Sequence, residues 1–470
     1  MKKILLIILT ACISLTSCDD FLTQDPYTTM PEGAAISDNI TANYALVGIY
    51  DQFQSELLYG RKYLVAPDAS TENIILSPSN SNRYIAQAQW SLTAGNGDAA
   101  DMWLYGYSAI NAANKILAKV DAIDATEKQK QQIKGEALAI KGMVHLDLVR
   151  IFAQAYPGNE RSLGIPYMEE SIIYDKPSRD DISTVYTKII RDLSEAAGLL
   201  QSSEIDNGPY RINSWTAKAL LAKAYMMQLD YVKAKPVLED IVKNSGYSIL
   251  SNTNYTSAWS KRYNAVSKTE FLFAIANLSS DYGATTSLGY IYLQSGYGDL
   301  RASDNIFALY TDTDVRKTAF FTAGTGTSAG WTMVNKYPSR DGSSGLSDVP
   351  MVRLSDIYLY YAEACAYTND EVNAIKYLDL IRQRGDASAT ASTETGDALK
   401  DKIFLERRKE LAYEGEYLFD LKRYHKTINS AYDATGKVYK TITYPSDLLA
   451  YPIPQGELDA NSNMEPNPGY

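Results

Sequence analysis

The chain has 470 residues, 45% of them hydrophobic, which is enough for a sizeable buried core. Its 56 acidic residues outnumber its 45 Lys and Arg residues, so the formal net charge is −11, and an acidic surface disfavours nucleic acid and anionic lipid as partners. No Cys-x-x-Cys pair and no histidine cluster indicates zinc, so we expect no metal and no cofactor.

The first segment, MKKILLIILTACISLTSC, has the pattern of an export signal. Lys2 and Lys3 precede an uncharged run, residues 4–17, which is too short to cross about 30 Å of hydrocarbon as a helix. The ending LTSC resembles the lipobox of bacterial lipoproteins, which implies that residues 1–17 are removed and that Cys18 carries the acyl chains. A secretory signal whose cysteine is incidental is the alternative.

Removal of the signal also removes Cys12, so Cys365 would be the only cysteine besides the acylated Cys18, and no intramolecular disulfide is expected. The loss of two lysines brings the mature net charge to −13. Asp19 and Asp20 are similar to the acidic tag of lipoproteins that Bacteroidetes-type cells send to the outer face of the outer membrane.

Helical periodicity continues through residues 136–152, 182–200 and 400–425. Residues 221–242 and 361–381 have the packing pattern of tetratricopeptide hairpins, and Cys365 replaces a packing tyrosine in the second copy, where we expect it to be a buried core residue. Such hairpins bury their faces by stacking on one another. The pattern predicts a mostly α fold, a tetratricopeptide-like helical solenoid with long irregular loops and minor β hairpins.

Three long stretches rich in small residues, 76–101, 277–305 and 322–348, carry isolated Tyr and Trp residues, and loops of this length are often functional. Trp90 and Trp331 are each alone in a polar loop, so we expect exposed rings. Sugars bind to flat aromatic faces through their CH groups, and the 37 tyrosines suit sugars but also peptides. The predicted ligand-binding residues are Arg83, Trp90, Asn96, Tyr290, Tyr292, Tyr297 and Trp331.

Within this set, GYIYLQ alternates, so Tyr290 and Tyr292 share one face if the segment is extended. A small β hairpin packed on the helices is the alternative. Arg83 and Asn96 flank Trp90 and can donate hydrogen bonds.

No constellation that could activate a nucleophile or a water is found in the sequence. The glycine-rich segment 324–330 lacks the Gly-Lys-Ser/Thr ending of a phosphate loop, and no Ser-His-Asp order with a nucleophile elbow accompanies the two histidines, His145 and His425. Glu406, Glu410 and Glu414 alternate with basic residues, which indicates an ion-pair network on a helix rather than acid/base chemistry. We therefore expect a protein without enzymatic activity.

Segments along the mature chain together resemble the SusD/RagB family of outer-membrane nutrient-binding lipoproteins. These segments are CDDFL, EALAIKGMVHLDLVRIF, RDDISTVYTKIIRDLSEA, YRINSWTAKALLAKAYM, VPMVRLSDIYLYYAEA, ERRKELAYEGEYLFDLKRYH and YPIPQGELDANSNMEPNPGY. The pair Glu416-Tyr417 departs from the family pattern, in which His-Arg is commoner, and this can alter local ion pairing.

The resemblance implies one SusD-like domain over residues 18–470, with a loop-rich ligand-binding half at roughly 66–105 and 270–350. It implies a lipid-anchored protein on the surface of the outer membrane that binds an oligosaccharide and delivers it to a SusC-like TonB-dependent transporter. Peptide binding, as in the RagB branch, is an alternative with the same fold. A second alternative is a scaffold that binds the transporter and no ligand. A third is a glycan-degrading enzyme, which would need a carboxylate pair that the sequence does not show.

If Cys18 is acylated, Cys18→Ala should abolish palmitate labelling and release the protein from the membrane fraction, because several acyl chains hold a protein firmly on a membrane. Full labelling of this variant would contradict the prediction. Replacing Asp19 and Asp20 by Ala should leave labelling intact but reduce surface exposure, which cleavage by external protease measures; unchanged cleavage would count against a role of these residues in export.

Overall fold

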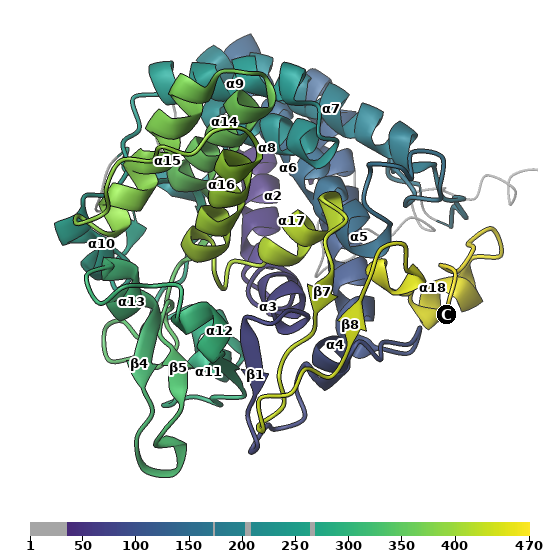
Figure 1. The fold of residues 1–470 in the computed structure, drawn as a ribbon. Helices are drawn as coiled ribbons and strands as arrows, with labels where there is room; N and C mark the ends of the chain where they lie inside the picture. Colours follow the sequence, from purple (N-terminus) through teal and green to yellow (C-terminus); the bar gives the residue numbers. More distant parts are fainter. Residues whose placement is uncertain (1–34, 173, 203–207, 264–267) are drawn as a thin grey trace, which may run out of the picture.

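The computed structural model describes residues 35–172, 174–202, 208–263 and 268–470. The predicted export signal, Cys18 and the acidic pair after it lie outside these residues. Helices dominate the described chain, and its short strands form two-stranded antiparallel sheets (Figure 1). No helix in the described ranges is both long and apolar enough to cross a membrane.

The N-terminal helices pack in series, α5 on α6 and α6 on α7, with α2 against α5 and α6. α6 begins at a capping box formed by Thr126 and Gln129. A Cβ atom at Gly142 of α6 would lie 2.8 Å from Cγ of Leu193, so glycine lets α6 and α7 approach closely. The bounds are α2 Asn39–Phe53, α3 Lys62–Ala69, α4 Ile85–Gln89, α5 Gly97–Lys119, α6 Glu127–Phe152 and α7 Ile182–Leu199.

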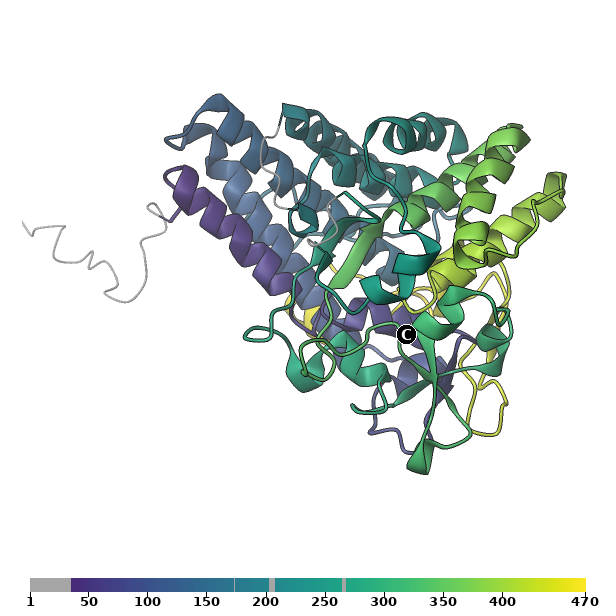
Figure 2. The ribbon, with the colours of Figure 1, turned by 90° about the vertical axis from the view of Figure 1, so that its left-hand side faces the viewer.

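The two predicted tetratricopeptide-like hairpins are confirmed. They are α8 (Ser214–Met227) with α9 (Tyr231–Asn244), and α14 (Leu354–Tyr367) with α15 (Glu371–Gly385). Ala222, Ala234 and their counterparts Ala362 and Ala374 are fully buried, as is Cys365. Helix α9 packs against α14, so the two hairpins stack although α10 to α13 separate them in the sequence (Figures 1 and 2).

Apart from α16, which packs on α14 and α15, the remaining elements are short, and most lie below the long helices in Figure 1. The helices are α10 Asn252–Ala258, α11 Leu288–Tyr292, α12 Asp304–Phe307, α13 Val315–Phe320, α16 Gly396–Glu410, α17 Tyr417–Arg423 and α18 Gln455–Ala460. The strands are β1 Ile74–Leu76, β2 Phe271–Ile275, β3 Leu300–Ala302, β4 Phe321–Ala323, β5 Thr332–Val334, β6 Val349–Arg353, β7 Ile428–Asn429 and β8 Thr441–Ile442. The strands pair as β1–β3, β2–β6, β4–β5 and β7–β8.

The 3₁₀ turns complete the list of elements. They span Val120–Ala122, Leu200–Ser202, Gly208–Tyr210, Ala284–Thr286, Gly326–Ser328 and Asp447–Leu449. The expected β hairpins exist as β4–β5 and β7–β8. The extended form considered for GYIYLQ is wrong, because this segment contains α11.

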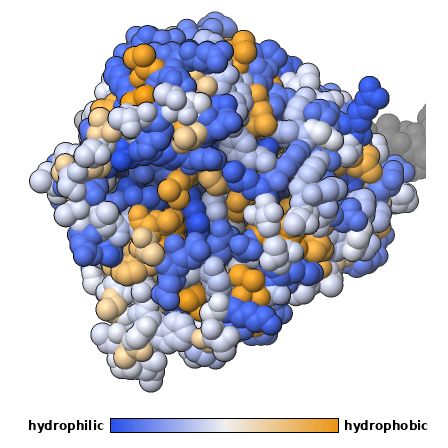
Figure 3. All heavy atoms as spheres, in the orientation of Figure 1, coloured by the Kyte–Doolittle hydropathy of each residue, from blue (hydrophilic) through white to orange (hydrophobic). Residues whose placement is uncertain are grey.

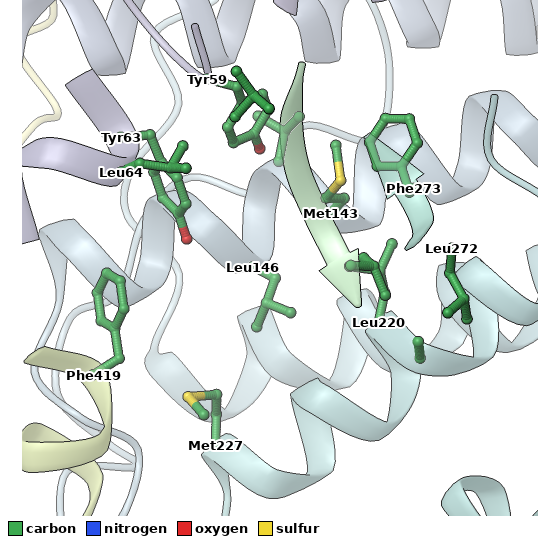
Figure 4. Close-up of a cluster of buried hydrophobic side chains, with 14 of the residues drawn as sticks. Tyr59, Tyr63, Leu64, Met143, Leu146, Leu220, Met227, Leu272, Phe273 and Phe419 are labelled. Atoms are coloured by element: carbon green, nitrogen blue, oxygen red, sulfur yellow. The ribbon is translucent and has the colours of Figure 1, made fainter. Parts of the chain in front are cut away.

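A contiguous buried core joins segments that are distant in the sequence. Tyr63 of α3 stacks on Phe419 of α17 at 6.3 Å between ring centroids. Figure 4 shows side chains from five elements meeting in this region. Those labelled are Tyr59, just before α3; Tyr63 and Leu64 of α3; Met143 and Leu146 of α6; Leu220 and Met227 of α8; Leu272 and Phe273 of β2; and Phe419 of α17.

The ion-pair network predicted for the glutamates of this region is present, but it is buried and the arginines around Glu410 come from other elements. Glu410 has no exposed surface and lies 3.0 Å from Arg316 of α13, 3.0 Å from Arg353 of β6 and 2.6 Å from Arg384 of α15. Burial alone would raise the pKa of Glu410, but these three arginines together lower it well below its usual value. Partners from three other elements therefore hold α16 in place.

A second buried carboxylate, Glu416, lies 2.5 Å from Arg150 of α6 and 2.8 Å from Lys223 of α8. The residue pair that departs from the family pattern therefore supplies an ion pair that connects α6 and α8 to the segment before α17. Removing one partner from such a buried arrangement leaves an uncompensated charge, which destabilises more than the pair itself stabilises.

We predict that Glu410→Gln lowers the free energy of unfolding by about 3–5 kcal/mol, because the surrounding arginines lose a shared countercharge in the protein interior. Denaturant titration followed by far-UV circular dichroism measures this change. Glu195→Gln is the matched control, because Glu195 is exposed and its loss should change stability by no more than about 0.5 kcal/mol. Equal midpoints for both variants would contradict a structural role for the network.

Candidate functional site

Parts of the three long, small-residue stretches lie side by side in the fold. β1 pairs with β3, β3 packs against β5, and β5 pairs with β4. Segment 324–330, predicted to be a loop, connects β4 to β5. The hydrogen bond from the side-chain amide of Gln294 to the carbonyl oxygen of Thr325, 2.8 Å long, attaches the loop after α11 to this connection. The strands thus gather the aromatic residues of distant stretches in one part of the molecule.

Two tyrosines and an arginine form the first half of this region. The Arg83 guanidinium lies over the Tyr297 ring, 3.6 Å from its centroid, and Tyr290 meets Tyr297 edge-on at 5.0 Å. All three side chains are half-buried, so each keeps part of its surface in solvent. Asp299 fixes this arrangement, because it accepts hydrogen bonds from the backbone and hydroxyl of Ser81, at 2.9 and 2.6 Å, and lies 3.4 Å from Arg83. We call Arg83, Tyr290, Tyr297, Arg301 and Trp331 the aromatic face.

Trp331 and Arg301 form the second half. Trp331 directly precedes β5 and is half-buried, and the Arg301 guanidinium of β3 lies 4.7 Å from its ring centroid. Arg301 is only 3% exposed, and its Nε and Nη1 atoms have no hydrogen-bond partner among the described residues. Burial lowers the pKa of the Arg301 guanidinium. Cation–π contact with the indole compensates part of this loss of water.

The expectation of an exposed ring at Trp90 is wrong. Trp90 is 6% exposed, its indole nitrogen donates a 2.8 Å hydrogen bond to the carbonyl oxygen of Ser70, and its ring packs in a separate apolar cluster. The other buried members of that cluster are Tyr417, Leu418, Leu421, Ile428, Ile442 and Leu449. The residues around Trp90 in the sequence are polar, but its packing partners come from the C-terminal part of the chain.

Asn96 and Tyr292 have structural positions as well. The Asn96 side-chain oxygen accepts a hydrogen bond from the backbone nitrogen of Ala99 at 3.0 Å and caps α5. Tyr292 is 1% exposed and stacks on Tyr337. The structure therefore brings only Arg83, Tyr290, Tyr297 and Trp331 of the predicted set to a partly exposed cluster.

Arg301 and Gln294 were missed by the sequence-based prediction. Arg301 stands between Leu300 and Ala302, so its charge interrupts a short apolar strand segment, and this was the available signal. The sequence contains no comparable signal for Gln294, because only the fold brings this residue near Thr325.

The two histidines are placed for packing. His145 is fully buried, stacks on Tyr167 at 3.8 Å and accepts a hydrogen bond from the backbone nitrogen of Met168 through Nε2. Burial lowers the pKa of His145 to about 3, so it is neutral at physiological pH. His425 stacks on Tyr444 at 3.6 Å. Within the described ranges, no three His, Cys, Asp or Glu side chains are grouped as metal ligands would be.

A different hollow, of about 260 Å³, lies beside α5. Its walls include the rings of Trp103 and Tyr107 and the exposed side chains of Leu104 and Ile172. Trp103 is only 5% exposed, and Tyr107 donates a hydrogen bond to the carbonyl oxygen of Pro166. This hollow is mostly apolar and offers a second location at which a ligand could be sought.

We predict that the two tryptophans contribute unequally to stability. Trp90→Ala should lower the free energy of unfolding by about 3–5 kcal/mol, because it removes a large side chain from a packed cluster and leaves a cavity. Trp331→Ala should cost about 1 kcal/mol, because this ring is already partly in solvent. Denaturant titrations of both variants test this, and an equal loss in both would contradict the positions described for the two rings.

Comparison with known proteins agrees with the fold. A family model described as "SusD family" matches residues 311–470, and one described as "Starch-binding associating with outer membrane" matches residues 20–226. The crystal structure of a candidate sugar-binding protein from Bacteroides vulgatus has 31% identity and a TM-score of 0.85, with 93% of this chain and 100% of that chain covered.

Two further relatives extend over most of the chain. The structure of a SusD-like carbohydrate-binding protein from Bacteroides vulgatus has 25% identity and a TM-score of 0.79, covering 91% of this chain and 97% of that one. A SusD-like protein of Bacteroides ovatus is 25% identical, over 90% of this chain and 82% of the relative. The helical scaffold and its stacked tetratricopeptide-like hairpins are consistent with these matches. The chain belongs to the SusD family.

Proposed function

We propose that this protein binds an oligosaccharide at the aromatic face. The observation that carries the proposal is the grouping of Tyr290, Tyr297 and Trp331, three partly exposed rings, beside two arginines in one part of the molecule. Sugar rings offer CH groups to aromatic faces and hydroxyls to polar side chains, and this cluster offers both kinds of contact.

The surface around the face suits a ligand that is part polar and part apolar. Figure 3 shows hydrophobic atoms in separate patches among hydrophilic ones on the side of the molecule seen in Figure 1. Exposed polar groups lie near the rings, among them Gln294 and the Ser295–Ser344 hydroxyl pair at 3.1 Å. The relatives named as carbohydrate-binding or starch-binding support the same ligand class.

Binding without turnover fits the ion pairing of the three glutamates at and just after the end of α16. Glu406, Glu410 and Glu414 lie within 4.0 Å of arginine or lysine nitrogens, which are positioned as countercharges rather than as proton donors to a ligand. Glycoside hydrolysis needs two carboxyl groups on either side of the scissile bond, one of them with a raised pKa. We therefore infer a capture protein rather than a hydrolase.

Peptide capture is the alternative ligand class, because tyrosine-rich surfaces bind peptides as well. A scaffold that binds only the transporter is the other alternative; it would make ring substitutions at the aromatic face neutral for ligand binding. Arrays of glycans and of peptides on the mature protein separate these three possibilities.

We predict that Trp331→Ala and Tyr297→Ala each weaken oligosaccharide binding by about thirtyfold, because an aromatic anchor at a binding hot spot contributes about 2 kcal/mol or more. Calorimetric titration with the best glycan from the array gives the affinity. Ile172→Ser in the hollow beside α5 is the matched control and should bind as the wild type does. If both ring variants bind normally and Ile172→Ser loses affinity, the ligand site lies in that hollow and not at the aromatic face.

We further propose that the protein delivers its ligand to a SusC-like TonB-dependent transporter and is held on the outer membrane by acyl chains at Cys18. The family description as associating with the outer membrane supports this location. A membrane tether raises the effective concentration of the protein near a partner in the same membrane. Stacked helical hairpins offer an extended surface for such a partner, which leaves the aromatic face free for the ligand.

Affinity purification of the tagged lipoprotein from its native membrane, in mild detergent and with ligand present, tests the partnership. We expect a stoichiometric TonB-dependent barrel in the eluate, and less of it when Cys18→Ala removes the tether. Recovery of the intact lipoprotein without any barrel would leave a free-standing surface binder.

A further inference from the structure

Arg301 differs from every other buried arginine that the structure describes. Ten arginines of the described residues are buried, and eight of them lie within 4.0 Å of a carboxylate oxygen. These eight are Arg61, Arg150, Arg316, Arg340, Arg353, Arg384, Arg407 and Arg423. Arg179 instead donates to backbone carbonyl oxygens and to the Asn467 side chain. Among the described residues, only Arg301 has neither kind of partner.

The environment of Arg301 compensates its charge poorly. Its neighbour across the β1–β3 pair is Ile75, and its ring contact is Trp331. A buried cation without a hydrogen-bonded countercharge is costly, and one ring contact returns only part of that cost. The fold therefore keeps an unmatched guanidinium at the aromatic face, where a ligand could supply the missing charge.

The three charged groups at the face sum to a positive charge although the chain as a whole is acidic. Arg83 and Arg301 contribute two positive charges, and Asp299, 3.4 Å from Arg83, contributes one negative charge. Trp331, which lies beside the Arg301 guanidinium, is partly exposed, and its preceding residue, Gly330, has open space around its Cβ position. An anion at the edge of the indole ring is thus the group that these contacts would hold.

We propose that Arg301 binds the negatively charged group of an acidic sugar, a carboxylate or a sulfate, beside the Trp331 ring. This inference rests on the proposed function and narrows it to acidic oligosaccharides. A guanidinium donates charge-assisted hydrogen bonds to the oxygens of a carboxylate or of a sulfate, so the geometry names the shared chemistry of the two.

An array of uronate-containing, sulfated and neutral oligosaccharides, followed by calorimetry on the hits, tests the inference with the mature protein. We expect an acidic ligand to bind at least about tenfold more tightly than its neutral counterpart, because a charge-assisted hydrogen bond stabilises more than a neutral one. The uronate and sulfate arms show which group is recognised. The affinity for the acidic ligand should fall at high salt, and that for a neutral ligand should not.

Arg301→Met should weaken binding of the acidic ligand at least about tenfold without affecting a neutral one. Its melting temperature should stay equal or rise, because it removes an uncompensated buried charge; a structural arginine would instead destabilise the fold. Arg161→Gln, which removes an exposed charge from the loop between α6 and α7, is the control and should bind normally. If Arg301→Met does not fold, the affinity of Arg301→Lys for the acidic ligand and the salt dependence of wild-type binding test the role of Arg301 instead.

Two results would overturn the inference, and they are distinguishable. Preference for neutral glycans, with no effect of Arg301→Met or Arg301→Lys, would leave glycan binding in place and remove the role of Arg301. Failure of the wild-type protein to bind any glycan on the array would contradict the proposed function and this inference together.

Discussion

The buried ion network around Glu410 holds the loop-rich part of this protein against its helical scaffold. The strands around the aromatic face, β1, β3, β4 and β5, have three residues each, and isolated two-stranded pairs of this size are marginally stable in water. Their stability must come from attachment to a larger body. Arg353, at the end of β6, and Arg316 of α13 both bond to Glu410 at the end of α16, so α16 is joined to both elements by buried ion pairs.

The same end of α16 positions the β4–β5 hairpin. Lys336 lies two residues after β5, and its side chain is fully buried. Its amino group donates hydrogen bonds to Glu414 at 2.5 Å and to the Ala412 carbonyl oxygen at 2.7 Å. Burial lowers the pKa of Lys336 to about 8, and the nearby Glu414 carboxylate limits this shift by favouring the charged amine. Trp331 therefore belongs to a hairpin whose base is fixed in the interior, while its connecting loop, residues 324–330, lies largely at the surface. Rigid attachment of a binding residue limits the entropy lost when a ligand is ordered.

Local periodicity predicted the helical scaffold well. The alanines and leucines of the two hairpins recur at helical spacing, and small residues at those positions are needed wherever two helices approach closely, so the pattern alone identified both hairpins and the burial of Cys365. The site was harder to predict because exposure is a tertiary property. Trp90 lies among polar residues in the sequence, yet its packing partners include Tyr417 and Ile442. The partners of Glu410 likewise come from three other elements, which no local pattern on α16 reveals.

We propose that a scaffold fixed by buried charges presents Tyr297, Trp331 and Arg301 to a sugar. A crystal structure of the mature protein with an oligosaccharide identified on the array tests this most directly. We expect a sugar ring stacked on Trp331 or Tyr297, an oxygen of the ligand within hydrogen-bond distance of the Arg301 guanidinium, and an unchanged Glu410 network. A ligand in the hollow lined by Trp103 and Tyr107, with the aromatic face empty, would contradict it.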